Sequence, residues 1–209
     1  TQLPVSRLLA QENKLKSESC IQYNVGAQYE GDGRFYKAEL YYKKYDRLAL
    51  VEKGTVDAAE VLTSGGYGYS KGFDLFFNDR VLLKNLEYQL SYTYNIAKRK
   101  FQEYTELTTP QYATQHNASL VLKYSIPRIG TIVGLTNRFS SGRPYHNPDL
   151  PGLMNDHVKP YNSLDLGLTF LPSKKVIIHA SATNILCPVS YTHLRAHETP
   201  EHLVCRLLL

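Results

Sequence analysis

The stretch Leu86 to Ile96, which reads Leu-Glu-Tyr-Gln-Leu-Ser-Tyr-Thr-Tyr-Asn-Ile, alternates strictly between two classes of side chain. Its even positions are apolar or aromatic, and its odd positions carry Glu, Gln, Ser, Thr and Asn. A period of two places these classes on opposite faces of a β-strand, whereas a helix would scatter them around its axis. The length matches the roughly 9–11 residues of a tilted membrane-crossing strand. A soluble β-sandwich strand has the same pattern, so the rest of the chain must decide.

Seven further segments alternate in the same way, at about 21–30, 35–48, 67–78, 117–126, 131–139, 163–171 and 175–184. Short turns, at about 31–34, 79–84, 127–130 and 172–174, alternate with long connections at about 49–66, 97–115 and 140–160. Outer-membrane barrels alternate in this way because their long loops all lie on the outer side. The pattern therefore predicts an all-β fold, an antiparallel meander of about eight strands with one lipid face and one polar, wet or plugged, lumen face.

Composition agrees with strands rather than with membrane helices. The chain has 209 residues, a mean hydropathy of −0.34, 17 Tyr and 7 Phe, and no run of 18 apolar residues. The net charge of +5 comes from scattered Lys and Arg, with the densest cluster at Lys98-Arg99-Lys100. We interpret this cluster as the solvated base of a loop rather than as a nucleic-acid patch, and we expect no nucleic-acid partner.

The three cysteines, Cys20, Cys187 and Cys205, have no metal-binding or Cys-x-x-Cys spacing and receive no role. The chain starts with Thr1 rather than Met. We expect an internal fragment whose targeting segment, if any, lies upstream, with residues 1–20 forming a loop or the end of a preceding strand.

Five motifs follow one another between about Ile21 and Leu186: Tyr41-Tyr42-Lys43-Lys44-Tyr45, Gly68-Tyr69-Ser70-Lys71-Gly72-Phe73-Asp74-Leu75, Leu82-Leu83-Lys84-Asn85-Leu86, Phe139-Ser140-Ser141-Gly142-Arg143-Pro144-Tyr145 and Ala182-Thr183-Asn184-Ile185-Leu186. In this order they resemble the C-terminal barrel of TonB-dependent outer-membrane receptors. Asp74 stands where the family usually has Glu.

This resemblance implies that residues 21–186 are a fragment of a large transmembrane β-barrel of about 22 strands with a plugged lumen. It implies energised uptake of a scarce nutrient (an iron chelate, a cobalamin-like cofactor or a glycan) in the outer membrane of a Gram-negative bacterium. The implied partners are outer-membrane lipid, a small-molecule or chelate ligand, and the plug domain and TonB complex of the full-length protein. We expect no enzymatic activity and no cofactor.

Residues 187–209 break the pattern, because they neither alternate nor end in the aromatic residue usual in the family. They resemble translated sequencing adaptor, and we predict that they are not native. His193, His197, His202 and Cys205 within them therefore receive no metal assignment, although their spacing resembles that of ligands. The competing interpretation is a genuine amphipathic tail.

The loop from Gly142 to Pro160 is the predicted place of ligand contact, because recognition concentrates in long outer loops on a rigid barrel. The candidate ligand-binding residues are Arg143, Tyr145, His146 and Asn147; variable loop filler is the competing interpretation. No catalytic residue is predicted. Ser140, Ser141 and Asp165 with a histidine would imitate a hydrolase triad, but the sequence has no nucleophile elbow.

Two alternatives remain open at this point. A complete small barrel could act as a passive pore, an adhesin or a surface enzyme, since eight strands close small barrels. Small residues on the polar face, such as Gly26, Ser91 and Ser119, suit a wide lumen better. A soluble sandwich comes third, and it would have to bury the broad Tyr/Leu/Val face against a second sheet.

Overall fold

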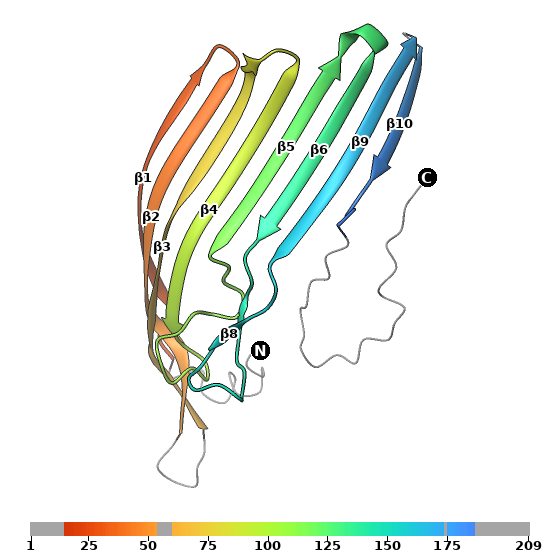
Figure 1. The fold of residues 1–209 in the computed structure, drawn as a ribbon. Coiled ribbons are helices and arrows are strands. Elements are labelled where there is room, and N and C mark those ends of the chain that lie inside the picture. Colours follow the sequence, from red (N-terminus) through yellow and green to blue (C-terminus); the bar gives the residue numbers. More distant parts are fainter. Residues whose placement is uncertain (1–14, 54–59, 174, 187–209) are drawn as a thin grey trace.

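The computed structural model describes residues 15–53, 60–173 and 175–186, and eight of its strands form one antiparallel sheet (Figure 1). In spatial order they are β1 (Ser19–Gly31), β2 (Arg34–Lys53), β3 (Glu60–Leu83), β4 (Leu86–Lys100), β5 (His116–Ile126), β6 (Thr131–Ser140), β9 (Tyr161–Ser173) and β10 (Val176–Ala182). A 3-10 turn, η1 (Pro127–Ile129), joins β5 to β6, and the short strands β7 (Pro144–Tyr145) and β8 (Asp156–His157) pair with each other. The predicted eight-stranded meander is confirmed.

The strand register carries the alternation of the sequence across the sheet. One row of partners is apolar and aromatic, and runs through Val25, Leu40, Phe73 and Tyr94. The row beside it is polar or small, and runs through Gly26, Glu39, Asp74, Thr93 and Asn117. Because side chains in a strand alternate between faces, the sheet has one apolar and one polar face.

The apolar face is bare in the described part of the chain, where Val25 is 73% and Leu40 61% exposed. Aromatic neighbours still stabilise it, since the Phe73 ring lies 5.8 Å from that of Tyr92 and 5.6 Å from that of Tyr94. A sandwich would bury this face against a second sheet, so the soluble-sandwich alternative does not fit.

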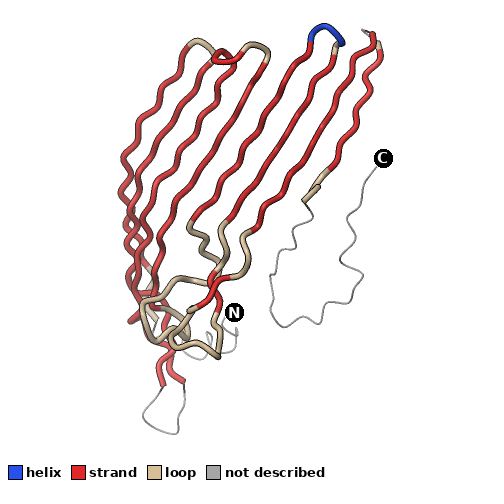
Figure 2. The backbone as a smooth tube through the Cα atoms, viewed as in Figure 1, coloured by secondary structure: helices blue, strands red, loops and turns tan. Residues whose placement is uncertain are grey.

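The sheet is curved and open, with β1 and β10 as its two edges (Figure 2). Edges that do not meet are inconsistent with a small barrel closed by these eight strands.

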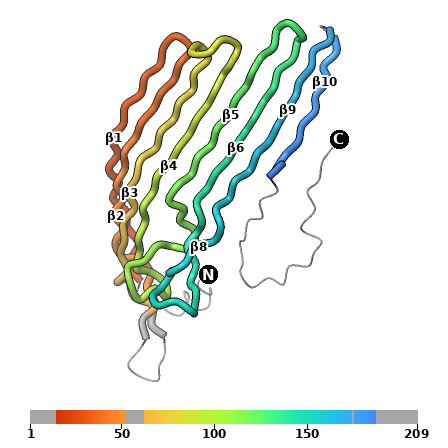
Figure 3. The backbone as a smooth tube through the Cα atoms, in the orientation of Figure 1, coloured from red at the N-terminus to blue at the C-terminus, as the bar shows by residue number. Residues whose placement is uncertain are grey.

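The two ends of the sheet differ (Figure 3). The turns after β1, β3 and β5 are short and lie at the upper end in the figures, and the connections 101–115 and 141–160 lie at the lower end. We call these the short-turn end and the long-connection end. The predicted sorting of the connections is thus confirmed for the described residues.

Three predicted connections are too long. β4 continues to Lys100, into the connection predicted at 97–115, and the β2–β3 and β3–β4 hairpins are longer than the alternation indicates. β2 continues to Lys53 and β3 begins at Glu60, so most of the connection predicted at 49–66 is strand. β3 also continues to Leu83, through the turn predicted at 79–84, with a register shift between Asp79 and Leu83.

Gly66 explains why the glycine-rich segment 64–66 is strand rather than flexible loop. A Cβ at Gly66 would lie 2.6 Å from the Leu48 carbonyl oxygen and 2.7 Å from that of Lys100. The glycine is needed because the flanking backbones approach closely, a reason that the sequence pattern does not reveal.

No helix in the described ranges has the length and apolar character needed to cross a membrane. The predictions for residues 1–14 and for the tail at 187–209 lie outside the described residues.

Candidate ligand-contacting surface at the long-connection end

The connection between β6 and β9 folds into a small ribbon at the long-connection end. β7 and β8 pair Pro144 with His157 and Tyr145 with Asp156 (Figure 1). The Val158 backbone N–H donates to the Arg143 carbonyl oxygen at 3.0 Å, which closes the base of the ribbon. This predicted ligand loop therefore has a defined shape.

The four predicted ligand residues divide into two pairs. Tyr145 Oη donates to Asp156 Oδ2 at 2.6 Å, and Asn147 Nδ2 donates to the same oxygen at 3.1 Å, so both side chains hold the loop together. Arg143 and His146 are exposed, and their side chains have no hydrogen bond or ion pair with another described residue. Of the four residues, Tyr145 and Asn147 therefore serve the structure of the loop itself.

Asn155 organises the tip of the loop. Its Nδ2 donates to the carbonyl oxygens of Leu150 at 2.6 Å, Asn147 at 2.9 Å and Gly152 at 3.0 Å. Its Oδ1 accepts from the Asn147 backbone N–H at 2.8 Å. One amide thus satisfies loop carbonyls that strand pairing does not reach.

Asp156 is held in its charged form by its neighbours. The hydrogen bond from Tyr145, followed by those from the His157 backbone N–H and Asn147, lowers the pKa of Asp156 below 3.8. The same bond raises the pKa of Tyr145 above 10.0. The pair is therefore ionised at Asp156 and neutral at Tyr145 across the physiological range.

A small buried cluster lies beneath the connection 101–115. Its members come from the extended β2–β3 hairpin, from β4 and from the connection itself: Leu48, Leu50, Leu62, Ala97, Pro110 and Ala113. The Val51 backbone N–H donates to Gln102 O and the Gln102 N–H to Ala49 O, both at 2.7 Å. The connection is thus packed onto the sheet.

Arg99 lies among aromatic rings beside this cluster. Its guanidinium carbon is 4.0 Å from the ring centre of Tyr45, 5.7 Å from that of Tyr112 and 6.0 Å from that of Phe101. Tyr45 and Arg99 pair with Gly68 from its two sides. Because Gly68 has no side chain, those of Tyr45 and Arg99 contact each other above this glycine on the polar face. Arg99 Nε is buried and makes no hydrogen bond with any described residue.

This arrangement corrects our interpretation of Lys98-Arg99-Lys100 as a solvated loop base. Lys98 is exposed, but Arg99 is half-buried and stacked on Tyr45. Tyr45 and Gly68 lie in predicted strands at positions of the polar face, but the sequence predicts Arg99 in the connection 97–115, whereas β4 continues to Lys100. Tyr112 could not be found in this way, because only the folded connection brings it near.

The two long connections also contact each other. Thr108 Oγ1 donates to the Leu153 carbonyl oxygen at 3.2 Å. Ser141 Oγ accepts from the backbone N–H groups of Gln115 at 3.0 Å and His116 at 3.1 Å. The connection that carries Tyr112 and the loop that carries Arg143 and His146 are therefore hydrogen-bonded to each other.

A family model described as the β-barrel of TonB-dependent-receptor-like proteins matches residues 6–185. The chain belongs to this family. The resemblance read from the sequence motifs is confirmed, and TonB-dependent receptors are transporters rather than enzymes.

Solved structures of TonB-dependent receptors share the fold. The ferric-catecholate import receptor Fiu from Escherichia coli K12 is 14% identical, with a TM-score of 0.66 over 83% of this chain and 24% of that chain. The FrpB iron transporter from Neisseria meningitidis is 13% identical, with a TM-score of 0.62 over 83% and 28% of the two chains. The ferric yersiniabactin uptake receptor FyuA from Yersinia pestis is 15% identical, with a TM-score of 0.62 over 82% and 25%.

The chain spans about a quarter of the length of these receptors. A search of curated protein sequences finds no match. The small-barrel alternative is not favoured.

The polar face of this receptor barrel carries ionic and hydrogen-bonded pairs instead of a second core. Glu39 meets Lys37 at 2.9 Å, Thr93 Oγ1 donates to Asp74 Oδ1 at 2.6 Å, and Arg138 meets Asp165 at 2.8 Å. On the same face, His179 Nδ1 lies 2.9 Å from Oγ1 of Thr169, its register partner.

The triad-like residues of the receptor barrel do not come together among the described residues. Ser140 Oγ donates to Asn117, Ser141 Oγ accepts backbone bonds, and Asp165 Oδ1 accepts from the Asn184 backbone N–H. His116 is bonded to Tyr92 Oη at 2.8 Å.

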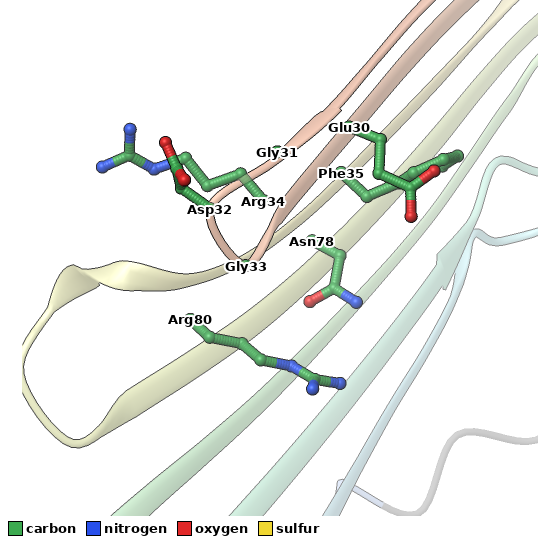
Figure 4. A pocket seen from close by; sticks show the side chains of 8 residues that line it. All are labelled: Glu30, Gly31, Asp32, Gly33, Arg34, Phe35, Asn78 and Arg80. Carbon is green, nitrogen blue, oxygen red and sulfur yellow. The ribbon is translucent and has the colours of Figure 1, made fainter.

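A hollow of about 350 Å³ lies by the β1–β2 turn, at the short-turn end (Figure 4). Asp32 and Arg34 extend to one side of the hairpin, and Glu30 and Asn78 lie on the other. Because these groups do not converge on one point, the hollow has no arrangement suited to catalysis or metal binding.

Proposed function

We propose that this chain is part of an outer-membrane TonB-dependent receptor that takes up an anionic iron chelate with aromatic iron-binding groups. The main support is the environment of Arg99, which is half-buried beside the rings of Tyr45 and Tyr112 at the long-connection end of the polar face. A guanidinium beside aromatic planes offers both a cation and stacking surfaces to such a ligand. Cobalamin-like and glycan ligands are the competing classes.

The exposed pair Arg143 and His146 supports the same proposal. Both belong to the loop that contacts the connection bearing Tyr112, through the bond of Thr108 to Leu153. We propose that Arg143 and His146 contact the chelate from the outer loop, while Tyr145 and Asn147 hold that loop in shape through Asp156.

The dimensions of the apolar face support a membrane location. On β3, Asp79 marks the short-turn end of this face and Lys71 the other, with Phe73, Leu75 and Phe77 between them. Eight residues rise ~26 Å along a strand, which at a tilt of ~40° spans ~20 Å of membrane thickness. The apolar stem of Lys71 extends this height toward the ~25 Å apolar band of an outer-membrane barrel. Under this proposal the short turns face the periplasm, and the full-length protein supplies the plug and the TonB contact.

An uptake experiment tests the proposal. A strain that lacks its own iron-chelate receptors would express the full-length receptor containing this segment, with and without TonB. We expect TonB-dependent uptake of radioactive iron from a catecholate chelate, and at least tenfold weaker binding of that chelate by Arg99→Gln. Arg128→Gln, in the turn η1 at the opposite end, removes the same charge and serves as the control.

Two results would contradict the proposal. Cobalamin or an oligosaccharide taken up in place of every ferric chelate would reject the ligand class. Equal chelate binding by Arg99→Gln and Arg128→Gln would reject the role of Arg99 in ligand binding.

A further inference from the structure

The charged side chains of the apolar face differ between the two ends of the sheet. In the regularly paired rows of β1 to β4, the short-turn end has Arg34 and Asp79, which form an ion pair of 3.3 Å. The long-connection end has an excess of positive charge, from Lys44, Lys71, Lys98 and Lys100 against Asp46. We call Lys44, Lys71 and Lys98 the basic rim.

The basic rim is compact. Lys44 and Lys98 pair with Tyr69 from its two sides, so strand spacing places their Cα atoms ~10 Å apart. Lys71 lies on the central strand one row nearer the middle of the sheet, ~7 Å along β3. All three are exposed, and the Lys71 ammonium lies 5.9 Å from the ring centre of Tyr69.

In the regularly paired rows of β2 to β5, three described lysines lie on the polar face, and one of them, Lys43, has its ammonium group 5.5 Å from the ring centre of Tyr41. Lys37 and Lys123 each have a carboxylate partner, Glu39 at 2.9 Å and Glu87 at 3.9 Å. In the basic rim, Lys44 meets Asp46 at 3.2 Å, but Lys71 and Lys98 have no acidic partner among the described residues. Their charges therefore face outward uncompensated, directly beside the apolar rows.

We propose that the basic rim binds the phosphate groups of a phosphorylated glycolipid in the outer leaflet, with its acyl chains lying against the apolar rows below. Charge complementarity supports this occupant, because anionic headgroups attract lysines at a membrane surface. Lysine stems can lie along the apolar face while their ammonium groups reach the headgroup level. The inference rests on the outer-membrane location proposed above.

Native mass spectrometry of the purified full-length receptor tests this site, with lipid A and enzymatically dephosphorylated lipid A as probes. We expect the triple variant Lys44→Gln/Lys71→Gln/Lys98→Gln to bind lipid A at least tenfold more weakly than the wild type. The matched control Lys37→Gln/Lys43→Gln/Lys123→Gln removes the same charge from the polar face and should bind normally. Heat-modifiable gel mobility verifies that each variant is folded.

Three results would overturn the inference: equal binding by the triple variant and the wild type, equal binding of dephosphorylated lipid A, or equal binding of phosphatidylglycerol. Iron uptake, measured on the same proteins, separates this inference from the proposed function. Wild-type protein that binds lipid A but takes up no chelate rejects the function alone. Normal iron uptake together with equal lipid A binding by the triple variant and the wild type rejects the inference alone.

Discussion

Small residues on the polar face have a definite role where a large side chain from the next strand covers them. A Cβ at Gly72 would lie 2.7 Å from Tyr41 Oη and would clash with the Tyr94 carbonyl oxygen. At Gly68, a Cβ would lie 2.7 Å from Arg99 Cγ. These glycines let an aromatic ring or an arginine lie flat across the strand, which shapes the lumen surface.

Gly72→Ala should therefore destabilise the barrel, because backbone and the Tyr41 ring must both move. The expected result is a clear loss of heat-modifiable, folded receptor in detergent. Gly134→Ala is the matched control, since its nearest neighbour would be 3.8 Å away. Equal folded fractions for the two variants would contradict this account.

The Tyr145–Asp156 bond predicts an acid-sensitive loop. A carboxyl group whose pKa is lowered in the folded state stabilises it above the ordinary pKa of 3.8, and this stabilisation is lost as pH falls through the lowered value. Pepsin should therefore cleave within 147–157 only at the acidic end of a series from pH 5 to pH 2.

Tyr145→Phe removes the main cause of the shift and should move the onset of cleavage to higher pH. Tyr161→Phe, at the start of β9, should leave the onset where it is in the wild type. An unchanged onset in Tyr145→Phe would show that the bond does not hold the loop.

At the scale of elements, the β2–β3 hairpin extends beyond its alternating part because it packs against the connection 101–115. Leu50, only 3% exposed, forms an isolated bridge with Gln102. At this extended end of the hairpin, burial under the connection stabilises strand pairing, and the alternation of apolar and polar residues does not continue.

Leu50→Ala should open this packed end, at a local cost of about 2–5 kcal/mol for a buried leucine. Faster hydrogen exchange at the amides of Val51 and Gln102 is the expected readout, since both donate in the hydrogen bonds that join the hairpin to the connection. Leu40→Ala, at a site 61% exposed, should leave these amides protected. Equal exchange in the two variants would argue against a buried cluster.

At the scale of the whole molecule, the described sheet has two open edges and one bare apolar face. Unpaired strand edges and broad apolar surface both favour association in water. The chain corresponds to about a quarter of the length of the receptors that share this fold.

The isolated chain should therefore aggregate in water and become dispersed in detergent, as judged by size-exclusion chromatography with light scattering. The apolar rows then contact detergent instead of other copies. A stable monomer in plain buffer would contradict the barrel interpretation.

The sequence by itself determined the strands, their order and their two faces, because a period of two depends only on neighbouring residues, as Leu86 to Ile96 illustrates. It also determined the sorting of short and long connections, and the family through ordered motifs.

Only the tertiary structure decided the ends of β2 and β3 and the surface around Arg99. The strand character of Gly66 depends on the backbones of Leu48 and Lys100, and the environment of Arg99 on Tyr45 and Tyr112. The division of the predicted ligand residues likewise depends on Asp156. It accepts hydrogen bonds from Tyr145 and Asn147, whereas Arg143 and His146 are exposed. Contacts between residues far apart in the chain follow from strand register and loop packing, and local periodicity predicts neither of these.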